Sequence, residues 1–190
     1  MRDGRWICSQ CWQARVPTDQ ALAELKEVAT QLAREGITVD LTNVSLALVD
    51  YSGLPGGGRR APLGHTQSEW RVRGSELTFA RAQIRIVSNL TRSLFHDVAA
   101  HELCHVWIAR HQRTPQPAPD CITEGAAQYA AFLVLSQMRG ADSLADYLLR
   151  KMEMDDDYNY GQCFRKARDY VHSHGGLPAL QRRLDRGSDL

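Results

Sequence analysis

The sequence predicts an α+β fold in which a small mixed sheet packs on a mainly helical C-terminal half. After one N-terminal helix, strand-like segments are confined to residues 37–88, and helical periodicity takes over across residues 91–184. Strands grouped before helices are typical of α+β domains. The chain of 190 residues fits one domain with at most a small appendage. Its 43% hydrophobic content is enough for a core of ordinary size.

Charge, hydropathy and cysteine usage exclude several classes of protein. The formal net charge is +1, from 23 basic and 22 acidic side chains, so no overall positive field favours nucleic acid or an anionic membrane. No apolar run approaches the ~20 residues of a membrane helix, and the first residues lack the apolar core of a signal peptide. The five cysteines are odd in number and sparse, which argues against a disulfide framework and favours a reducing compartment. We therefore expect a cytoplasmic protein that binds neither nucleic acid nor membrane.

Residues 1–16 contain two cysteines, Cys8 and Cys11, with the spacing of half a structural zinc site. A closed site needs four ligands, and the three other cysteines are dispersed along the chain. We interpret this segment as a truncated zinc module. Two incidental cysteines are one alternative, and a redox pair is a weaker one because no βαβ pattern follows.

One helix and one strand follow. Pro17 to Gly36 places apolar residues on one helical face, with Thr18 as N-cap and Gly36 as the C-terminal stop. Residues 37–50 then alternate between apolar and polar side chains, which predicts one strand. Residues 51–64 include three consecutive glycines and are expected to form a loop.

A hairpin and a further strand are expected before residue 91. Residues 69–73 and 76–79 have the character of paired strands turned at Gly74-Ser75. Residues 83–88 predict a separate strand that leads into the next helix. We expect that strand to lie along a cleft and to offer unpaired backbone groups to an extended peptide.

The helix expected over residues 91–111 carries the sequence His101-Glu102-Leu103-Cys104-His105, which is the H-E-x-x-H pattern. Residues four apart on a helix are about 40° apart around its axis, so both imidazoles can bind one metal ion from one face. Glu102 lies beside that ion without binding it. It therefore remains free to act as a general base.

A catalytic zinc site usually has three protein ligands and a water. Glu124 supplies the third donor, because it follows His105 after 18 intervening residues and stands in the first turn of a second helix. The proline-rich residues 114–119 reverse the chain between the two helices. We therefore predict a Zn²⁺ site formed by His101, His105 and Glu124.

The remaining C-terminal residues are expected to be helical. The helix over residues 121–139 has Asp120 as its N-cap and Gly140 as its stop, and its alanines allow close packing on the helix with the histidines. Further helices are expected at residues 142–153, 161–172 and 178–184.

The same residues also permit other interpretations. The histidines could be satisfied core or surface groups of an amphipathic helix, with Glu124 placed near a helix start for its dipole. A second alternative is a catalytically inactive, zinc-stabilised protein-interaction module. The general-base position of Glu102 argues against it, because a structural site closes its fourth position with a protein ligand. A metal-dependent amidase acting on a small molecule is a third alternative, which the shape of the cleft would distinguish.

The chain resembles the peptidase region of the LIM-domain, ubiquitin-activated peptidases known as regulators of plant organ size. The similar segments are Asp3-Gly4-Arg5 with Cys8-x-x-Cys11, Val44 to Asp50, Ala100-His101-Glu102-x-x-His105-x-Trp107, Glu124-Gly125-x-x-Gln128 and Tyr160-Gly161-x-x-Phe164-Arg165. The last three together are specific, and the N-terminal likeness is looser. No ubiquitin-interacting segment occurs in this sequence, so dependence on a ubiquitin-like activator is not carried over from the resemblance.

The resemblance implies a gluzincin-type zincin fold, with a cleft between a small sheet and a helical half. It also implies a zinc metalloendopeptidase that acts on protein or peptide substrates. Residues 1–16 would be a remnant of a LIM-like zinc knuckle, and residues 17–190 would be the peptidase domain. In this interpretation a zinc-activated water attacks the peptide bond, and Glu102 takes its proton.

Tyr160 lies in the similar C-terminal motif and is the first candidate for stabilising the oxyanion. The alternatives are Tyr158, His172 and His174. The ligand histidines also need hydrogen-bond partners that orient them. Gln128 is the first candidate and Asp97 the second, because each is one helical turn from a metal ligand. The other histidines expected to be ordinary residues are His65, His96 and His111.

Overall fold

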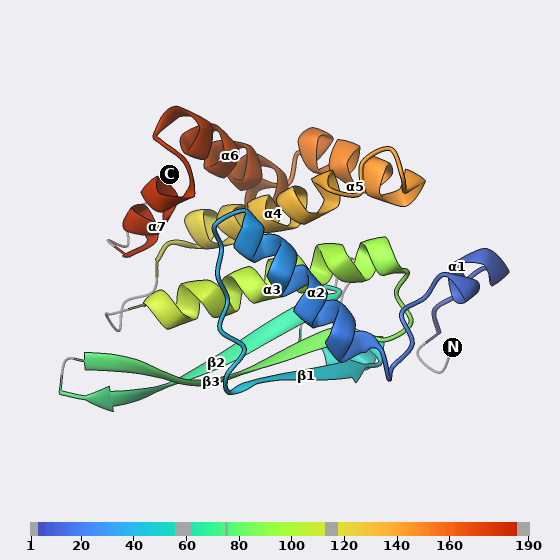
Figure 1. Cartoon of the computed structure of the whole chain (residues 1–190), viewed down its shortest axis with the longest axis horizontal. Helices are drawn as coiled ribbons and strands as arrows, with labels where there is room; N and C mark the ends of the chain where they lie inside the picture. Colours follow the sequence, from blue (N-terminus) through green and yellow to red (C-terminus); the bar gives the residue numbers. More distant parts are fainter. Residues whose placement is uncertain (1–3, 56–61, 75, 113–117, 186–190) are drawn as a thin grey trace.

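A computed structural model describes residues 4–55, 62–74, 76–112 and 118–185. Within these ranges the chain is mixed α+β, which confirms the predicted class, and a three-stranded sheet forms one layer beneath the helices (Figure 1). The three consecutive glycines at residues 56–58, the hairpin residue Ser75 and most of the proline-rich reversal lie outside the described residues. The elements are α1 Ser9–Gln13, α2 Ala21–Arg34, β1 Val44–Val49, the 3-10 turn η1 Tyr51–Gly53, β2 Gly64–Arg73, β3 Glu76–Val87, α3 Arg92–His111, α4 Asp120–Ser136, α5 Ser143–Met154, the π-helical turn η2 Tyr158–Gln162, α6 Cys163–Ser173 and α7 Leu177–Asp185.

The strand order is β1-β3-β2, with β1 parallel and β2 antiparallel to β3. The hairpin at Gly74 is confirmed, but the predicted strands at residues 76–79 and 83–88 are one continuous strand, β3. Since β3 is paired on both sides, it has no free edge for a peptide, and that prediction is wrong. The free edge nearest α3 belongs to β2, whose other side is unpaired among the described residues.

The core lies where α3 is enclosed between the sheet and α4 (Figure 1). Ile84 and Ile86 of β3 are fully buried beneath α3, and Leu103 and Val106 of α3 are fully buried as well. On the other side of α3, the alanines of α4 are buried and leave room for close approach, as predicted. A helix covered on two sides has buried residues all around it, and this holds for α3. The enclosure fixes the helix that carries the two histidines.

Several helix ends differ from the predictions. Gly36, at φ +91°, follows α2 as expected, but the N-cap of α2 is Gln20 and not Thr18. Asp120 is the first residue of α4 and not its cap, because the helix begins after Pro119. The π-helical turn η2 was not predicted, since its residues carry no helical apolar period.

One disulfide, Cys121–Cys163, joins the first turn of α4 to the start of α6. Its cysteines are 42 residues apart, and pairing over such a distance cannot be deduced from sequence. The number and spacing of the cysteines argued against a disulfide framework and did not predict this disulfide, so the inference of a reducing compartment loses its support. No helix among the described residues is long and apolar enough to cross a membrane.

A partly buried group of polar side chains joins α2 to α3. Glu24 Oε2 lies 2.6 Å from His96 Nε2 and 2.9 Å from Arg92 Nε, and His96 is almost completely buried. Burial acts to raise the pKa of Glu24, but the contacts with His96 and Arg92 outweigh it and lower the pKa. His96 is therefore a structural residue, as expected for an ordinary histidine.

We expect Glu24→Gln to lower the free energy of unfolding by about 1–3 kcal/mol near neutral pH. Because the pKa of Glu24 is lower in the folded chain, this stabilisation is present above the unfolded-state pKa of about 4.3. It is lost as the pH falls through the folded-state pKa. Urea unfolding across this pH range measures the difference. Glu27→Gln is the matched control, since Glu27 is half-exposed and 3.5 Å from Arg92. A difference that does not shrink in acid would contradict this account.

Candidate metal centre

Helix α3 places the two motif histidines side by side. The Nε2 atoms of His101 and His105 are 3.0 Å apart, as expected for side chains one helical turn apart on the same face. Both imidazoles line a cleft between α3 and the edge strand β2. The geometry predicted from the H-E-x-x-H pattern is therefore present.

Glu124 reaches the histidines from the first turn of α4. Helices α3 and α4 run antiparallel (Figure 1), so the start of α4 returns to the middle of α3. Glu124 Oε2 lies 3.3 Å from His101 Nε2, and Glu124 Oε1 lies 3.6 Å from His105 Nε2. The three donors lie within 4.8 Å of one another and could hold a metal ion. The convergence predicted for these three residues is confirmed.

The donor set fits a zinc ion. Tetrahedral coordination with bonds of about 2.0–2.2 Å separates ligand atoms by roughly 3.3–3.6 Å. The two His–Glu distances fall within that range, and the 3.0 Å between the two imidazole nitrogens is shorter than it. Glu124 Oε2 is buried and accepts no hydrogen bond among the described residues. A buried carboxylate oxygen without a hydrogen-bond partner costs free energy, so this atom is suited to a cation. The geometry does not distinguish zinc from other divalent metals.

The protonation states also suit metal binding. Burial and the charge of His101 lower the pKa of His105 to about 4, so its imidazole is neutral. Burial acts to raise the pKa of Glu124, but the two imidazoles outweigh it and keep the carboxylate ionised. For His101, burial acts to lower the pKa, but the surrounding carboxylates raise it overall. A divalent cation would compete with a proton for the ring nitrogen of His101.

Glu102 lies beside the three donors but is not one of them. Its side chain is 5% exposed, and its Oε2 accepts a 2.7 Å hydrogen bond from the hydroxyl of Thr66 on β2. Burial raises the pKa of Glu102, with His101 and Thr66 opposing. Gly64 allows this contact, because a Cβ there would lie 2.6 Å from Glu102 Oε1. A carboxylate held in this way can accept a proton from a neighbouring water.

Two adjoining cavities extend from the donors, with volumes of about 360 and 980 Å³. The smaller lies between β2 and the C-terminal half of α3. The larger extends past the N-terminal half of α3 to the segment Lys151–Asp157. Both include His101, Glu102 and Tyr160 in their lining. Because they share these residues, the two cavities meet at the candidate metal centre and form one cleft. A third cavity, along α5 beside Arg139 and Gly140, includes none of the three donors.

Tyr160 lies at this cleft, and its ring centre is 6.2 Å from that of His101. The other three oxyanion candidates do not line the two cavities. Tyr158 lies under Lys166, His172 contacts Tyr129, and His174 stacks on Tyr170. Tyr160 is therefore the one of the four predicted candidates that reaches the donors.

Gln128 and Asp97 both line the larger cavity. Neither hydrogen-bonds to His101 or His105 among the described residues, so their predicted role in orienting the imidazoles lacks a contact. Burial raises the pKa of Asp97 to about 6, with His101 and Lys151 opposing.

Two residues of the site were missed from the sequence. Thr66 contacts Glu102, and His65, expected to be an ordinary residue, lines the cleft with a pKa that burial and Arg85 lower. The run Gly64-His65-Thr66-Gln67-Ser68 is polar on both faces, so it gave no strand signal. Gly64, next to two polar side chains, was the one feature of the sequence that hinted at a close approach between this strand and another element.

Cys8 and Cys11 do not form a second metal centre with other residues in the described part of the chain. Cys8 Sγ accepts a hydrogen bond from the backbone N–H of Cys11, and Cys8 caps the short helix α1. The segment is attached to the turn before α3 by backbone hydrogen bonds from Val16 to Leu90 and from Arg92 to Ala14. Its interpretation as a zinc-knuckle remnant remains a prediction.

No protein-family model matches the chain, and no curated protein or solved structure is significantly similar to it. The likeness to the LIM-domain peptidases therefore remains a prediction, and so does the zincin fold.

Proposed function

We propose that the protein is a zinc-dependent metallopeptidase that hydrolyses peptide bonds of protein or peptide substrates. One observation carries the proposal: His101, His105 and Glu124 converge in an open cleft with the buried carboxylate of Glu102 beside them. When bound there, zinc would supply Lewis acidity, which lowers the pKa of a water and polarises a carbonyl.

Glu102 is the general base in this proposal. The Thr66 hydroxyl donates a hydrogen bond to Oε2 of Glu102, so Oε1 is the oxygen that takes a proton from the attacking water. The same carboxyl group then gives the proton to the amine that leaves. Burial favours the return of the proton, because it raises the pKa of Glu102. A base positioned in this way contributes about 10²- to 10⁴-fold in rate.

The edge strand β2 favours a polypeptide as the substrate. Among the described residues β2 has a strand partner on one side only, and Gly64, Thr66, Ser68 and Trp70 line the smaller cavity. An extended peptide can add to such an edge through main-chain hydrogen bonds. Trp70 Nε1 donates to the carbonyl of Ala109, which fixes β2 against α3 at the end of the cleft. We therefore propose that β2 binds the peptide, in place of residues 83–88.

Tyr160 is proposed to donate its hydroxyl hydrogen to the developing oxyanion. Its half-exposed position lets it approach a bound substrate, and burial and nearby carboxylates raise the pKa of its hydroxyl, which keeps it protonated. We expect Tyr160→Phe to lower kcat on the order of 10²-fold with little change in KM. Steady-state kinetics would test this, and an equal loss in kcat and in zinc binding would contradict the role.

Thr66→Val removes the hydroxyl that holds Glu102 while keeping the side-chain shape. A hydrogen bond to a charged group contributes about 1.5–3 kcal/mol, so we expect kcat to fall by about 10- to 100-fold. Zinc titration should give an unchanged affinity. Thr66→Ser, which keeps the hydroxyl, is the matched control. If both variants lose the same activity, the hydroxyl is not what positions Glu102.

The main alternative is a zinc-stabilised interaction module without catalysis. Structural zinc sites are closed by four protein ligands, whereas the cluster here has three donors among the described residues and borders a cleft. The volumes of the two adjoining cavities also favour a peptide over a small amide.

The direct test incubates the wild-type chain and the Glu102→Gln variant, both loaded with zinc, with a denatured peptide library. New peptide termini are then mapped by mass spectrometry. We expect new termini with the wild type alone, and a parallel reaction with ubiquitin tests for an activator. The proposed activity would be refuted if the wild type and the Glu102→Gln variant produced the same new termini. It would also be refuted if no reaction, with or without ubiquitin, produced any.

A further inference from the structure

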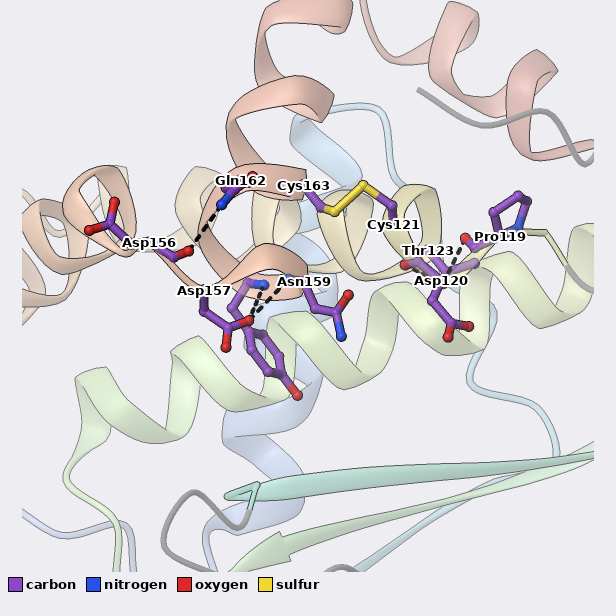
Figure 2. The surroundings of a disulfide bond; sticks show 10 residues. Pro119, Asp120, Cys121, Thr123, Asp156, Asp157, Asn159, Gln162 and Cys163 are labelled. Atoms are coloured by element: carbon purple, nitrogen blue, oxygen red, sulfur yellow. Dashed lines mark hydrogen bonds between the residues drawn. A yellow bond between two sulfur atoms is a disulfide. The ribbon is translucent and has the colours of Figure 1, made fainter.

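The Cys121–Cys163 disulfide lies between the two segments that bring Glu124 and Tyr160 to the cleft (Figure 2). Cys121 is three residues before Glu124, and Cys163 is three residues after Tyr160. We propose that this disulfide positions the third metal donor, so that the metal affinity of the chain depends on the oxidation state of the two cysteines. The inference rests on the proposed function only in taking His101, His105 and Glu124 as the metal ligands.

The first turn of α4 packs into the core through Ile122, which is fully buried, but its hydroxyl and cap hydrogen bonds reach no other element among the described residues. Its N-cap residue is Pro119, which makes no side-chain capping hydrogen bond. The hydroxyl of Thr123 donates to the carbonyls of Pro119 and Asp120, which belong to the same turn (Figure 2). These bonds hold the turn together but do not attach it to another element. The disulfide is a covalent attachment between this turn and α6.

The other end of the disulfide is firmly placed. Cys163 is fully buried where η2 meets α6. Asp157 accepts hydrogen bonds from the backbone N–H groups of Asn159 and Tyr160, and Gln162 donates to the carbonyl of Asp156 (Figure 2). These bonds hold the turn that carries Tyr160 in shape, and the full burial of Cys163 and Phe164 anchors this end of the disulfide in the core.

Gly125 shows how closely the two segments approach beside the disulfide. A Cβ on Gly125 would lie 2.4 Å from the carbonyl oxygen of Cys163, a separation that no side chain tolerates without backbone movement. Gly125 is adjacent to Glu124 in the chain. The spacing between the backbone around Glu124 and the backbone of Cys163 therefore depends on two features. One is the absence of a side chain at Gly125, and the other is the disulfide.

The histidines and Glu124 depend on this support to different degrees. His101 and His105 share one helix, which fixes their separation whatever happens to the disulfide. Glu124 comes from a different helix, so its distances of 3.3 and 3.6 Å to the imidazoles depend on where α4 begins. Loss of a group that orients a ligand typically costs about 10- to 100-fold in metal affinity. We expect a loss of that size on reduction.

Reduction of the Cys121–Cys163 disulfide proceeds by two thiol–disulfide exchange steps. One thiolate of a dithiol reductant attacks one sulfur of the pair and displaces the other cysteine as a thiolate. The second thiol of the reductant then displaces the remaining cysteine, which closes the reductant into its own disulfide. Two electrons and two protons thus pass to Cys121 and Cys163. Their exposures of 4% and 0% mean that the reductant gains access only when this region opens.

Thermodynamic linkage between metal binding and disulfide reduction gives a second, independent prediction. If the disulfide tightens metal binding by some factor, the bound metal must stabilise the disulfide against reduction by the same factor. This relation concerns binding equilibria alone. It can therefore be measured whether or not the protein hydrolyses anything.

The experiment measures zinc affinity by competition with a chelator for the oxidised chain, the reduced chain and the Cys121→Ser/Cys163→Ser variant. We expect about 10- to 100-fold weaker binding in the last two. The serine pair has no thiols at these positions, so it excludes zinc binding by the freed cysteines. Cys8→Ser/Cys11→Ser is the matched control and should keep the affinity of the oxidised wild type.

The second measurement needs no variant and holds even if the serine pair fails to fold. Wild-type chain is equilibrated in glutathione redox buffers with and without zinc, and free thiols are counted. The midpoint should shift towards the disulfide in zinc by the factor found for affinity. Equal zinc affinity in both redox states, or no disulfide in chain purified without reductant, would overturn the inference. Zinc binding with the expected redox dependence but without hydrolysis would instead refute the proposed function alone.

Discussion

Replacing Glu102 with glutamine is expected to lower kcat for peptide hydrolysis by about 10²- to 10⁴-fold while zinc binding is retained. The amide keeps the shape of the carboxyl group and can still interact with Thr66, but it cannot accept the proton of the attacking water. The three metal donors lie on other residues, so the substitution leaves the ligand set intact. Peptide kinetics and zinc content are measured on the same preparation.

Glu69→Gln provides the matched control for this variant. Glu69 is on β2, about half-exposed, and forms an ion pair with Arg81 at 2.8 Å. Its substitution should leave kcat unchanged, because a surface ion pair contributes little. Full activity of the Glu102 variant with a full complement of zinc would remove Glu102 from the mechanism.

Glu124→Ala is expected to abolish tight zinc binding, with a loss in affinity beyond the roughly 100-fold that follows when a residue orienting a ligand is removed. Zinc that binds the folded chain stabilises it in proportion to ln(1 + [Zn]/Kd), about 4 kcal/mol at 1,000 times Kd. We therefore expect zinc to raise the Tm of the wild type and to leave the Tm of this variant unchanged. Differential scanning calorimetry with and without zinc measures both.

The Glu124→Gln variant refines this prediction. Glutamine fills the same space and keeps one oxygen, so packing at the start of α4 is preserved while the charge is lost. Its zinc affinity should lie between those of the wild type and the alanine variant. If zinc raises the Tm of Glu124→Ala as much as that of the wild type, the third ligand has been assigned to the wrong residue.

Features that depend on local sequence were well predicted. The spacing of His101 and His105 requires only one helical turn, and the position of Glu124 requires only that the chain reverse between two helices. Gly36 ends its helix through a positive φ that glycine adopts readily. Each of these follows from residues close in sequence or from a simple antiparallel return.

Features that depend on distant contacts were missed. The continuity of β3 through Ala80-Arg81-Ala82 is set by pairing with β2, with β1 joining β3 on its other side from Ala82 onward, and that segment lacks alternation of its own. The contact of Thr66 with Glu102 crosses 36 residues, and the disulfide crosses 42. Residues so far apart give no local signal, so the edge strand that borders the cleft was assigned to the wrong residues.

The central claim is that three side chains bind one metal ion and leave a position open to solvent. A crystal structure of the zinc-loaded chain, with the metal identified by anomalous scattering at the zinc edge, tests it most directly. The account predicts zinc bonded to His101 Nε2, His105 Nε2 and a carboxylate oxygen of Glu124, with a solvent molecule next to Glu102. A zinc ion enclosed by four protein ligands, or bound without Glu124, would contradict it.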